Sequence, residues 1–277
     1  MTNKTKNIQQ AEKSLQIIEA GMYFHGESNV SVKDQIAKSI GSTFTASPAG
    51  LKELTDQELP AAKYDTQIEV NRMSTNEALA VDRPGLKTAV LNFASAKNPG
   101  GGFLGGAVAQ EESLARSSSL YASLTKDRTL YEFNRSQSTF LYSDYMIYSP
   151  EVLFWMDDNG EFLEKPVSVD VITSPAPNKG AMKQNNRPQE IDQIEETFRV
   201  RIDKLFALAV SQKVECLILG AWGCGVFQND PAQVAVYFKE ALENKYKGQF
   251  KLIVFAIYGR RDESILNTFK EVFHVKS

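Results

Sequence analysis

Short apolar runs separated by helical segments place the strongest constraint on how this chain can fold. The runs Cys216–Leu219 and Leu252–Ile257 contain no polar residue, which is too uniformly apolar for a strand with one face in water. We therefore expect strands covered by helices on both faces. The same kind of run occurs at Gln67–Val70, Ala89–Phe93 and Val167–Ile172. Together these runs predict an α/β protein with three layers, helix–sheet–helix.

Helix signals lie between these runs. Ser74 and Glu77 form a capping-box pattern that opens a helix near Asn76–Val81, and Asp230-Pro231 is an N-cap followed by proline at the first helical position. Apolar spacing predicts further helices over 7–20, Ala49–Leu59, Gln110–Leu124, Gln189–Ser211, 231–244 and Glu263–Phe273. Asn159-Gly160 predicts a β-hairpin within Tyr131–Leu163, a region whose tyrosines we interpret as packing groups.

The strongest strand signals begin after residue 60. We therefore expect residues 1–60 to form an N-terminal, helical accessory segment packed on a main domain of residues 61–277, the two making one compact unit. The length of 277 residues suits one large domain with such an appendage.

Charge and composition exclude several classes. The net charge of -3 argues against broad nonspecific binding to nucleic acid. Two cysteines and two distant histidines provide neither a disulfide framework nor a zinc site, so we expect no metal and no cofactor. The polar N-terminus and the absence of an apolar run of ~20 residues predict no membrane span and a cytoplasmic location.

A glycine-rich segment precedes a cluster of acids. Gly100-Gly101-Gly102 leads within seven residues to Gln110-Glu111-Glu112, at the start of a predicted helix. Glycines let backbone amides approach phosphates and sugars, and carboxylates beside them can act as acid or base. A favourable interaction with the helix dipole accounts for one acidic residue at the start of the helix, but it accounts less well for both Glu111 and Glu112.

The same segment matches the pattern G-x-G-x-x-G at Gly100, Gly102 and Gly105. A dinucleotide-binding fingerprint needs its glycines at the junction of strand and helix, but Ser95–Pro99 intervenes here. A nicotinamide-dependent oxidoreductase is therefore a weak alternative.

A second glycine loop, Gly220–Asp230, follows the strand Cys216–Leu219 and precedes a helix. Its amides and the helix N-terminus suit a diphosphate, and Phe227 can pack against a ribose or a base. In an open sheet, such loops converge at the carboxyl ends of the strands. No histidine lies near Cys224, so we interpret it as a small loop residue rather than a nucleophile, and Cys216 as core.

Taken together, these residues resemble the bacterial-type poly(ADP-ribose) glycohydrolases, whose signature is Gly-Gly-Gly, six to eight residues, then Gln-Glu-Glu. The segments Asn92–Pro99, Ser113–Ser118, Ile172–Asn178 and Gly220–Pro231 also look like this family, and the similarity covers about residues 10–275. The resemblance implies a macrodomain-like fold with a mixed sheet.

The resemblance also implies roles. Glu112 would be the catalytic acid, Glu111 would orient the ligand ribose, Phe227 would position the distal ribose, and Tyr258 would stack on adenine. Gly259-Arg260-Arg261 stands where an acidic residue is expected soon after Tyr258. The full set of ligand contacts implied is Ser95, Asn98, Gly100, Gly101, Gly102, Gln110, Gly223, Cys224, Gly225, Val226, Phe227 and Tyr258.

The implied activity is hydrolysis of the ribose–ribose O-glycosidic bonds of poly(ADP-ribose), mainly from the chain end, by a monomer that releases ADP-ribose. Two alternatives stay open at this point: a hydrolase of mono-ADP-ribose, and a macrodomain that binds ADP-ribose without cutting it.

Overall fold

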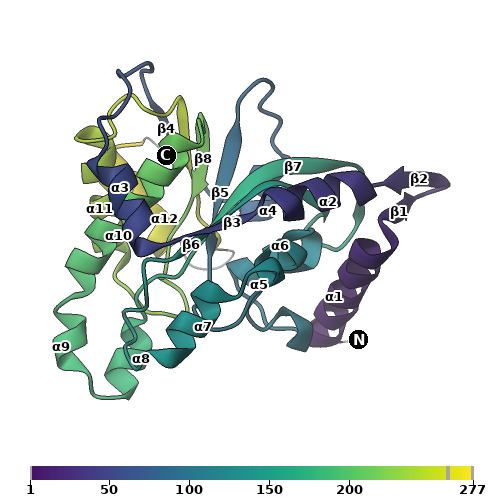
Figure 1. Ribbon diagram of the computed structural model, residues 1–277, viewed down its shortest axis with the longest axis horizontal. Coiled ribbons are helices and arrows are strands. Elements are labelled where there is room, and N and C mark those ends of the chain that lie inside the picture. Colours follow the sequence, from purple (N-terminus) through teal and green to yellow (C-terminus); the bar gives the residue numbers. More distant parts are fainter. Residues whose placement is uncertain (1, 260–262, 276–277) are drawn as a thin grey trace.

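The computed structural model describes residues 2–259 and 263–275, and a seven-stranded mixed sheet lies at its centre (Figure 1). The strand order is β3-β6-β7-β5-β8-β9-β4. Strands β7, β5, β8, β9 and β4 run parallel, whereas β6 is antiparallel to both β7 and β3. Their bounds are Phe44–Ala46 (β3), Gln67–Asn71 (β4), Thr88–Phe93 (β5), Met146–Met156 (β6), Phe162–Ser174 (β7), Cys216–Leu219 (β8) and Leu252–Ala256 (β9).

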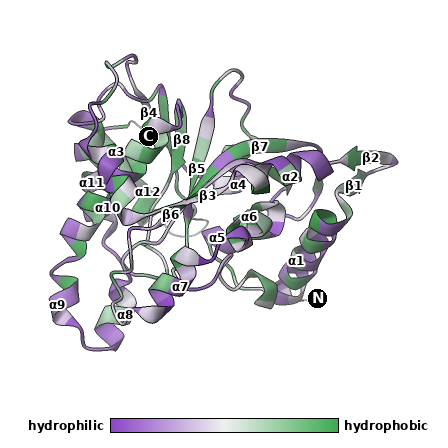
Figure 2. Cartoon of the chain, in the orientation of Figure 1, coloured by the Kyte–Doolittle hydropathy of each residue, from purple (hydrophilic) through white to green (hydrophobic). Residues whose placement is uncertain are grey.

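Helices cover both faces of this sheet, which confirms the predicted α/β class and its three layers. Along β8, Leu217 and Leu219 pack in the core shared with α3 (Pro48–Asp56), α10 (Ile194–Ser211), α11 (Pro231–Glu243) and α12 (Ser264–Phe273). Cys216 and Ile218 point to the opposite core, shared with α4 (Thr75–Ala80), α5 (Gln110–Ser117), α6 (Leu120–Lys126) and α7 (Thr129–Ser136). In Figure 2, β8 at the centre is coloured hydrophobic, whereas the outlying α9 (Pro188–Ile191) is coloured hydrophilic.

The predicted β-hairpin is confirmed as β6 and β7. Its turn is closed by hydrogen bonds from the amides of Asn159 and Glu161 to Asp157 Oδ1, each 2.8 Å long. Gly160 has φ +80°, a conformation that favours glycine. Strand β7 is longer than the predicted run Val167–Ile172, because its outer end pairs with the outer end of β6 beyond the body of the sheet.

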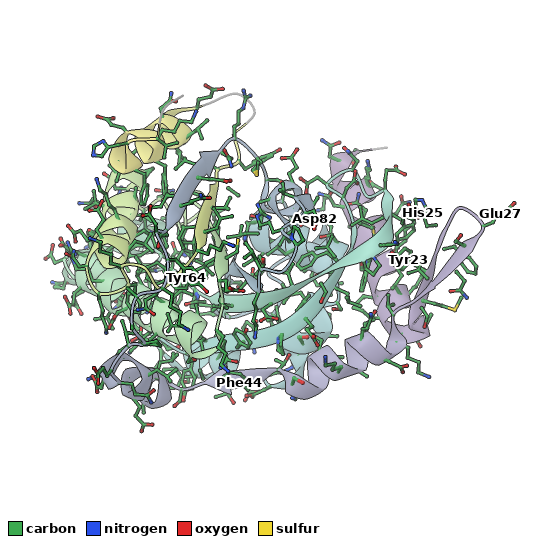
Figure 3. All side chains as sticks on the ribbon, turned by 90° about the horizontal axis from the view of Figure 1, so that it is seen from above. Tyr23, His25, Glu27, Phe44, Tyr64 and Asp82 are labelled. Atoms are coloured by element: carbon green, nitrogen blue, oxygen red, sulfur yellow. The ribbon has the colours of Figure 1, made fainter. Side chains whose placement is uncertain are left out.

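The N-terminal segment begins with α1 (Asn3–Ala20), four residues earlier than predicted. A two-stranded sheet, β1 (Met22–His25) and β2 (Ser28–Ser31), and α2 (Lys33–Ser42) follow. Ile17, Val32 and Ile36 pack on Trp155 of the β6–β7 hairpin. Figure 3 places His25 and Glu27 at the outer end of the β1–β2 projection. Because β3 pairs with β6, this segment also supplies an edge strand of the main sheet.

Two predicted helices are each divided in two. The expected helix Gln110–Leu124 is interrupted at Ser118, whose backbone is extended and forms a bridge with Phe154 of β6. The expected helix Gln189–Ser211 is α9 followed by α10, after the short α8 (Lys179–Gln184). The capping box at Ser74 and Glu77 is confirmed. No helix among residues 2–259 and 263–275 is long and apolar enough to cross a bilayer.

Candidate active site

A cavity of about 660 Å³ lies where the chain leaves the carboxyl ends of β5 and β8. These two strands are neighbours and parallel, so the two glycine loops that follow them line the same space. The volume is typical of a site for a small organic ligand. The structure therefore brings together two loops that are more than 100 residues apart in the sequence.

The Gln110 side chain bonds to the backbone of β5 at the cavity, where β5 and β8 no longer pair. The pairing of β5 with β8 ends at Val90 and Ile218, although β5 continues to Phe93. Beyond that point, Gln110 Oε1 accepts a hydrogen bond from the Phe93 amide at 2.8 Å, and its Nε2 donates to the Leu91 carbonyl at 2.8 Å. The Gln110 side chain thus satisfies backbone groups that a longer β8 would have paired.

The first loop reverses direction at Gly100 and Gly101, with φ of +70° and +59°. A Cβ on Gly101 would lie 2.9 Å from Glu112 Cδ and 3.2 Å from Glu111 Oε2. Only glycine fits here, because any side chain would enter the space between the two carboxyl groups. The triple-glycine motif and the paired acids are therefore one packed unit.

Glu111 is 2% exposed and its carboxyl group is held by three donors. Oε2 accepts from the Ser95 amide at 2.6 Å, and Oε1 accepts from Asn92 Nδ2 and the Gly100 amide, each at 3.2 Å. Burial raises the pKa of Glu111 to about 8, and these hydrogen bonds oppose part of that rise. Glu111 thus ties the start of α5 to the loop from Ser95 to Gly100.

Glu112 lies in the cavity wall and is less buried than Glu111. Its Oε1 accepts a hydrogen bond of 3.0 Å from the Gly102 amide. Within the described residues, no group hydrogen-bonds to its Oε2, which is available to a molecule in the cavity. The arrangement can present one carboxyl oxygen for proton transfer while the backbone fixes the other.

The second loop is held closed by Asn229. Its Nδ2 donates to the carbonyls of Pro177 at 2.8 Å and Gly223 at 3.0 Å. Gly223 has φ +73°, and a Cβ there would lie 2.6 Å from both Ala176 Cβ and Asn229 Nδ2. The loop is thereby packed against the end of β7, with Gly225, Val226 and Phe227 facing the cavity.

Most residues singled out from the sequence meet at this cavity. Ser95, Asn98, Gly101, Gly102, Gln110, Glu111, Glu112, Gly223, Gly225, Val226, Phe227 and Tyr258 line it. Gly100 and Cys224 do not. Gly100 is buried behind the loop, where its amide bonds to Glu111. Cys224 is 9% exposed, its thiol points to the Trp222 carbonyl, and burial raises its pKa far above the ordinary value. Arg260 and Arg261 lie outside the described residues.

Tyr142 also lines the cavity, although the sequence interpretation assigned the tyrosines of this region to packing. Its ring centroid is 6.2 Å from that of Phe227, and its hydroxyl accepts from Asn178 Nδ2 at 3.3 Å. Its backbone has φ +60°, which is uncommon for a non-glycine residue. No sequence signal marked it, because the segment 138–145 forms no helix or strand.

The buried guanidinium of Arg201 is hydrogen-bonded to the segment that carries Tyr142. Arg201, 1% exposed, donates to the carbonyls of Leu141 and Tyr142 at 3.1 and 3.2 Å, and to Asp144 Oδ1 at 2.9 Å. Lys204 Nζ donates to the other oxygen of Asp144 at 2.6 Å. Burial alone would raise the pKa of Asp144, but the two cations lower it below its ordinary value.

No cluster of three or more His, Cys, Asp or Glu side chains that could hold a metal ion occurs in residues 2–259 and 263–275. The polar residues that line the cavity instead carry side-chain amides, hydroxyl groups, the Lys97 ammonium group and the two carboxyl groups, beside the backbone of the two glycine loops. Such a lining suits an anionic, hydroxyl-rich ligand.

Comparison with known proteins agrees with this description. The family model for the catalytic domain of microbial-type poly(ADP-ribose) glycohydrolase matches residues 11–157, more than half of the chain. The chain belongs to the microbial-type poly(ADP-ribose) glycohydrolases. No curated protein matches the chain.

Solved structures of bacterial poly(ADP-ribose) glycohydrolases match along nearly the whole chain. The enzyme from Thermomonospora curvata is 40% identical, with a TM-score of 0.90, and the match covers 97% of this chain and 100% of that one. Its complex with the inhibitor ADP-HPD is 38% identical, with a TM-score of 0.88 over 96% and 99% of the two chains. The enzyme from Deinococcus radiodurans in complex with ADP-ribose is 39% identical, with a TM-score of 0.80 over 87% and 98%.

The mixed sheet is thus macrodomain-like, as the resemblance implied. Membership of the poly(ADP-ribose) glycohydrolases makes the chain an enzyme and assigns it the activity that defines the family, hydrolysis of poly(ADP-ribose). The cavity between the two glycine loops is the candidate active site for that reaction.

Proposed function

We propose that Glu112 is the residue that carries out this hydrolysis, acting first as a general acid and then as a general base. The observation that supports it most is the position of its carboxyl group. The Gly102 amide holds Oε1, no group in the described residues hydrogen-bonds to Oε2, and Glu112 lines a cavity that both glycine loops also line. Glu111, by contrast, has both oxygens occupied by the protein.

The proposed ligand position follows from the lining. The amides of Gly225, Val226 and Phe227 are offered to one diphosphate, and the backbone of Gly101 and Gly102 lies against the diphosphate and the ribose. Phe227 packs against the distal ribose and directs it towards Glu112, with Glu111, Ser95 and Asn98 around its hydroxyl groups. Tyr258, 63% exposed at the rim, stacks on adenine.

Each step conserves protons and electrons. Protonated Glu112 gives its proton to the departing ribose hydroxyl oxygen as the bond from that oxygen to C1 of the distal ribose breaks. The oxocarbenium character left on the distal ribose is stabilised in part by the adjacent diphosphate. Ionised Glu112 then removes a proton from water, whose oxygen attacks C1 and releases ADP-ribose. One carboxyl group thus does the work that two share in most glycosidases.

Replacing Glu112 tests the proposal. In Glu112→Gln the amide oxygen still accepts from Gly102, but the side chain no longer carries a titratable proton. We expect turnover to fall at least about 100-fold, because general acid–base catalysis contributes about that much. The Kd for ADP-ribose, measured by calorimetry, should change little. Release of ADP-ribose from polymer near the wild-type rate by either Glu112→Gln or Glu112→Ala would rule out the assignment.

The products separate the remaining possibilities. We propose cleavage mainly from the chain end, so ADP-ribose monomer should accumulate from the first turnovers on polymer of defined length. Early shorter oligomers would indicate internal cleavage. Hydrolysis of mono-ADP-ribosylated protein at a higher kcat/KM than that of polymer would favour the mono-ADP-ribosylated substrate.

The monomeric state and the cytoplasmic location stay predictions. Light scattering of the purified enzyme at micromolar concentration tests the first.

A further inference from the structure

Arg116 follows Glu112 by one helical turn on α5 and is 7% exposed. Arg116 is not among the residues that line the cavity. Nη1 donates to the Ala107 carbonyl at 2.7 Å, and Nη2 donates to Ser113 Oγ at 3.1 Å. Arg116 thus joins the helix that carries the proposed acid to the far end of the glycine loop.

Ala107 continues this connection to the cavity. Its amide donates to the Gly102 carbonyl at 3.2 Å, and the Gly102 amide donates to Glu112 Oε1 at 3.0 Å. The contacts form a closed ring that runs from Glu112 along α5 to Arg116, then to Ala107 and Gly102, and back to Glu112. Because the ring is closed, the length of each of these contacts restricts where the Glu112 carboxyl group can lie.

Helix α1 supports the ring from outside. Ser14 Oγ donates to the Arg116 carbonyl, and Asn7 Nδ2 donates to the Gly106 carbonyl at 3.2 Å. Ala11, Phe103 and Ala115 pack together between α1, the loop and α5. Helix α1 therefore holds the loop at Gly106 and α5 at Arg116, and the Arg116 guanidinium supplies the charged contact between the loop and α5.

We propose that Arg116 is a positioning residue for catalysis: through Ala107 and Gly102 it sets the place of the Glu112 carboxyl group. This rests on the proposed role of Glu112. The charge of Arg116 is itself maintained there, since Glu112 and Asp158 favour the charged form although burial lowers its pKa.

Removal of the guanidinium tests this role with a readout that a purely structural residue would not move. In Arg116→Met we expect kcat on polymer to fall at least about ten-fold, because a displacement of about 1 Å in a catalytic group can cost up to 100-fold. The Kd for ADP-ribose should stay within about three-fold, since the lining itself is unchanged. Arg116→Lys, which can still donate to Ala107, should recover part of kcat.

Ser14→Ala is the matched control. It removes a hydrogen bond to the Arg116 carbonyl and one from Trp155 Nε1, and leaves the guanidinium in place. We expect a lower Tm with kcat within about two-fold of wild type. If Arg116→Met does not fold, the same test compares Arg116→Lys with Ser14→Ala under conditions where the two variants have similar Tm. We then expect kcat to be lower in Arg116→Lys than in Ser14→Ala.

The proposal is overturned by an unchanged kcat in Arg116→Met, by an equal loss in Ser14→Ala, or by a lysine variant no better than methionine. Retained turnover in Glu112→Gln would instead refute the assignment of the acid, so the two failures are distinguishable.

Discussion

The amide of Gly102 donates to Oε1 of Glu112 at 3.0 Å, so the last residue of the triple-glycine motif directly holds the second residue of the acid pair. The seven residues between the motifs form the 3₁₀ turn Phe103–Gly105 and a return to Ala109, the residue before α5. The triple glycine and the acid pair look like two separate motifs in the sequence, but they form one hydrogen-bonded structure.

Gly101→Ala should abolish most activity. A Cβ at this position meets Glu112 Cδ at 2.9 Å, and the backbone has φ +59°. We expect turnover to fall at least about 100-fold because both carboxyl groups must move. The free energy of unfolding should fall by about 1–2 kcal/mol from the left-handed backbone alone. Gly105→Ala is the control: a Cβ there meets no atom within 4 Å, so activity and Tm should stay close to wild type.

The second loop offers a similar pair. In Gly223→Ala the new Cβ would lie 2.6 Å from Ala176 Cβ with φ +73°, whereas in Gly225→Ala it meets nothing within 4 Å. We expect denaturant unfolding to show a loss of about 1–3 kcal/mol for Gly223→Ala, from overpacking and backbone strain. Gly225→Ala should lose less than about 0.5 kcal/mol. Equal stability of the two variants would contradict this account of the loop.

Glu111 should make folding stability depend on pH. Burial raises its pKa in the folded state to about 8 from the ordinary 4.5, so the folded protein binds more protons than the unfolded chain between these values. Its contribution to stability therefore falls as pH rises from 4.5 to 8, by at most about 1.4 kcal/mol per pH unit. Urea unfolding at pH 5, 6, 7 and 8 should show a smaller fall in Glu111→Gln. Parallel curves for the two proteins would refute the raised pKa.

Two arginines on α10 should behave differently. Arg201 is 1% exposed, so Arg201→Met leaves the partly buried carboxylate of Asp144 with Lys204 alone and removes the donor to three backbone carbonyls, which should cost about 3–5 kcal/mol. Arg199, two residues away, pairs with Glu195 and Glu240 at the surface, and Arg199→Met should cost less than about 1 kcal/mol. Chemical denaturation compares the two, and a similar loss in both would contradict the difference. Arg201→Met should also weaken ADP-ribose binding, because it releases the segment that carries Tyr142.

The five parallel strands and the two glycine loops could be predicted because their signals are local, whereas the edge strand β3 was not predicted. Uniform apolar runs specify buried strands, and glycines specify positive φ at Gly101 and Gly223. The interruption at Ser118 could not be predicted in this way, because it depends on a bridge to Phe154, 36 residues away. Tyr142 was missed for a related reason: it is held at the cavity by Arg201 of α10, 59 residues further along the chain.

The early end of the β5–β8 ladder has a consequence for how substrate enters. Gln110 bonds to the Leu91 carbonyl and the Phe93 amide, so the backbone of β5 beyond the ladder is satisfied when no ligand is bound. An incoming polymer end therefore meets a preformed slot and need not separate paired backbone before the reaction begins. The free-energy cost of leaving β5 and β8 unpaired at this point arises once, during folding, and does not recur in every catalytic cycle.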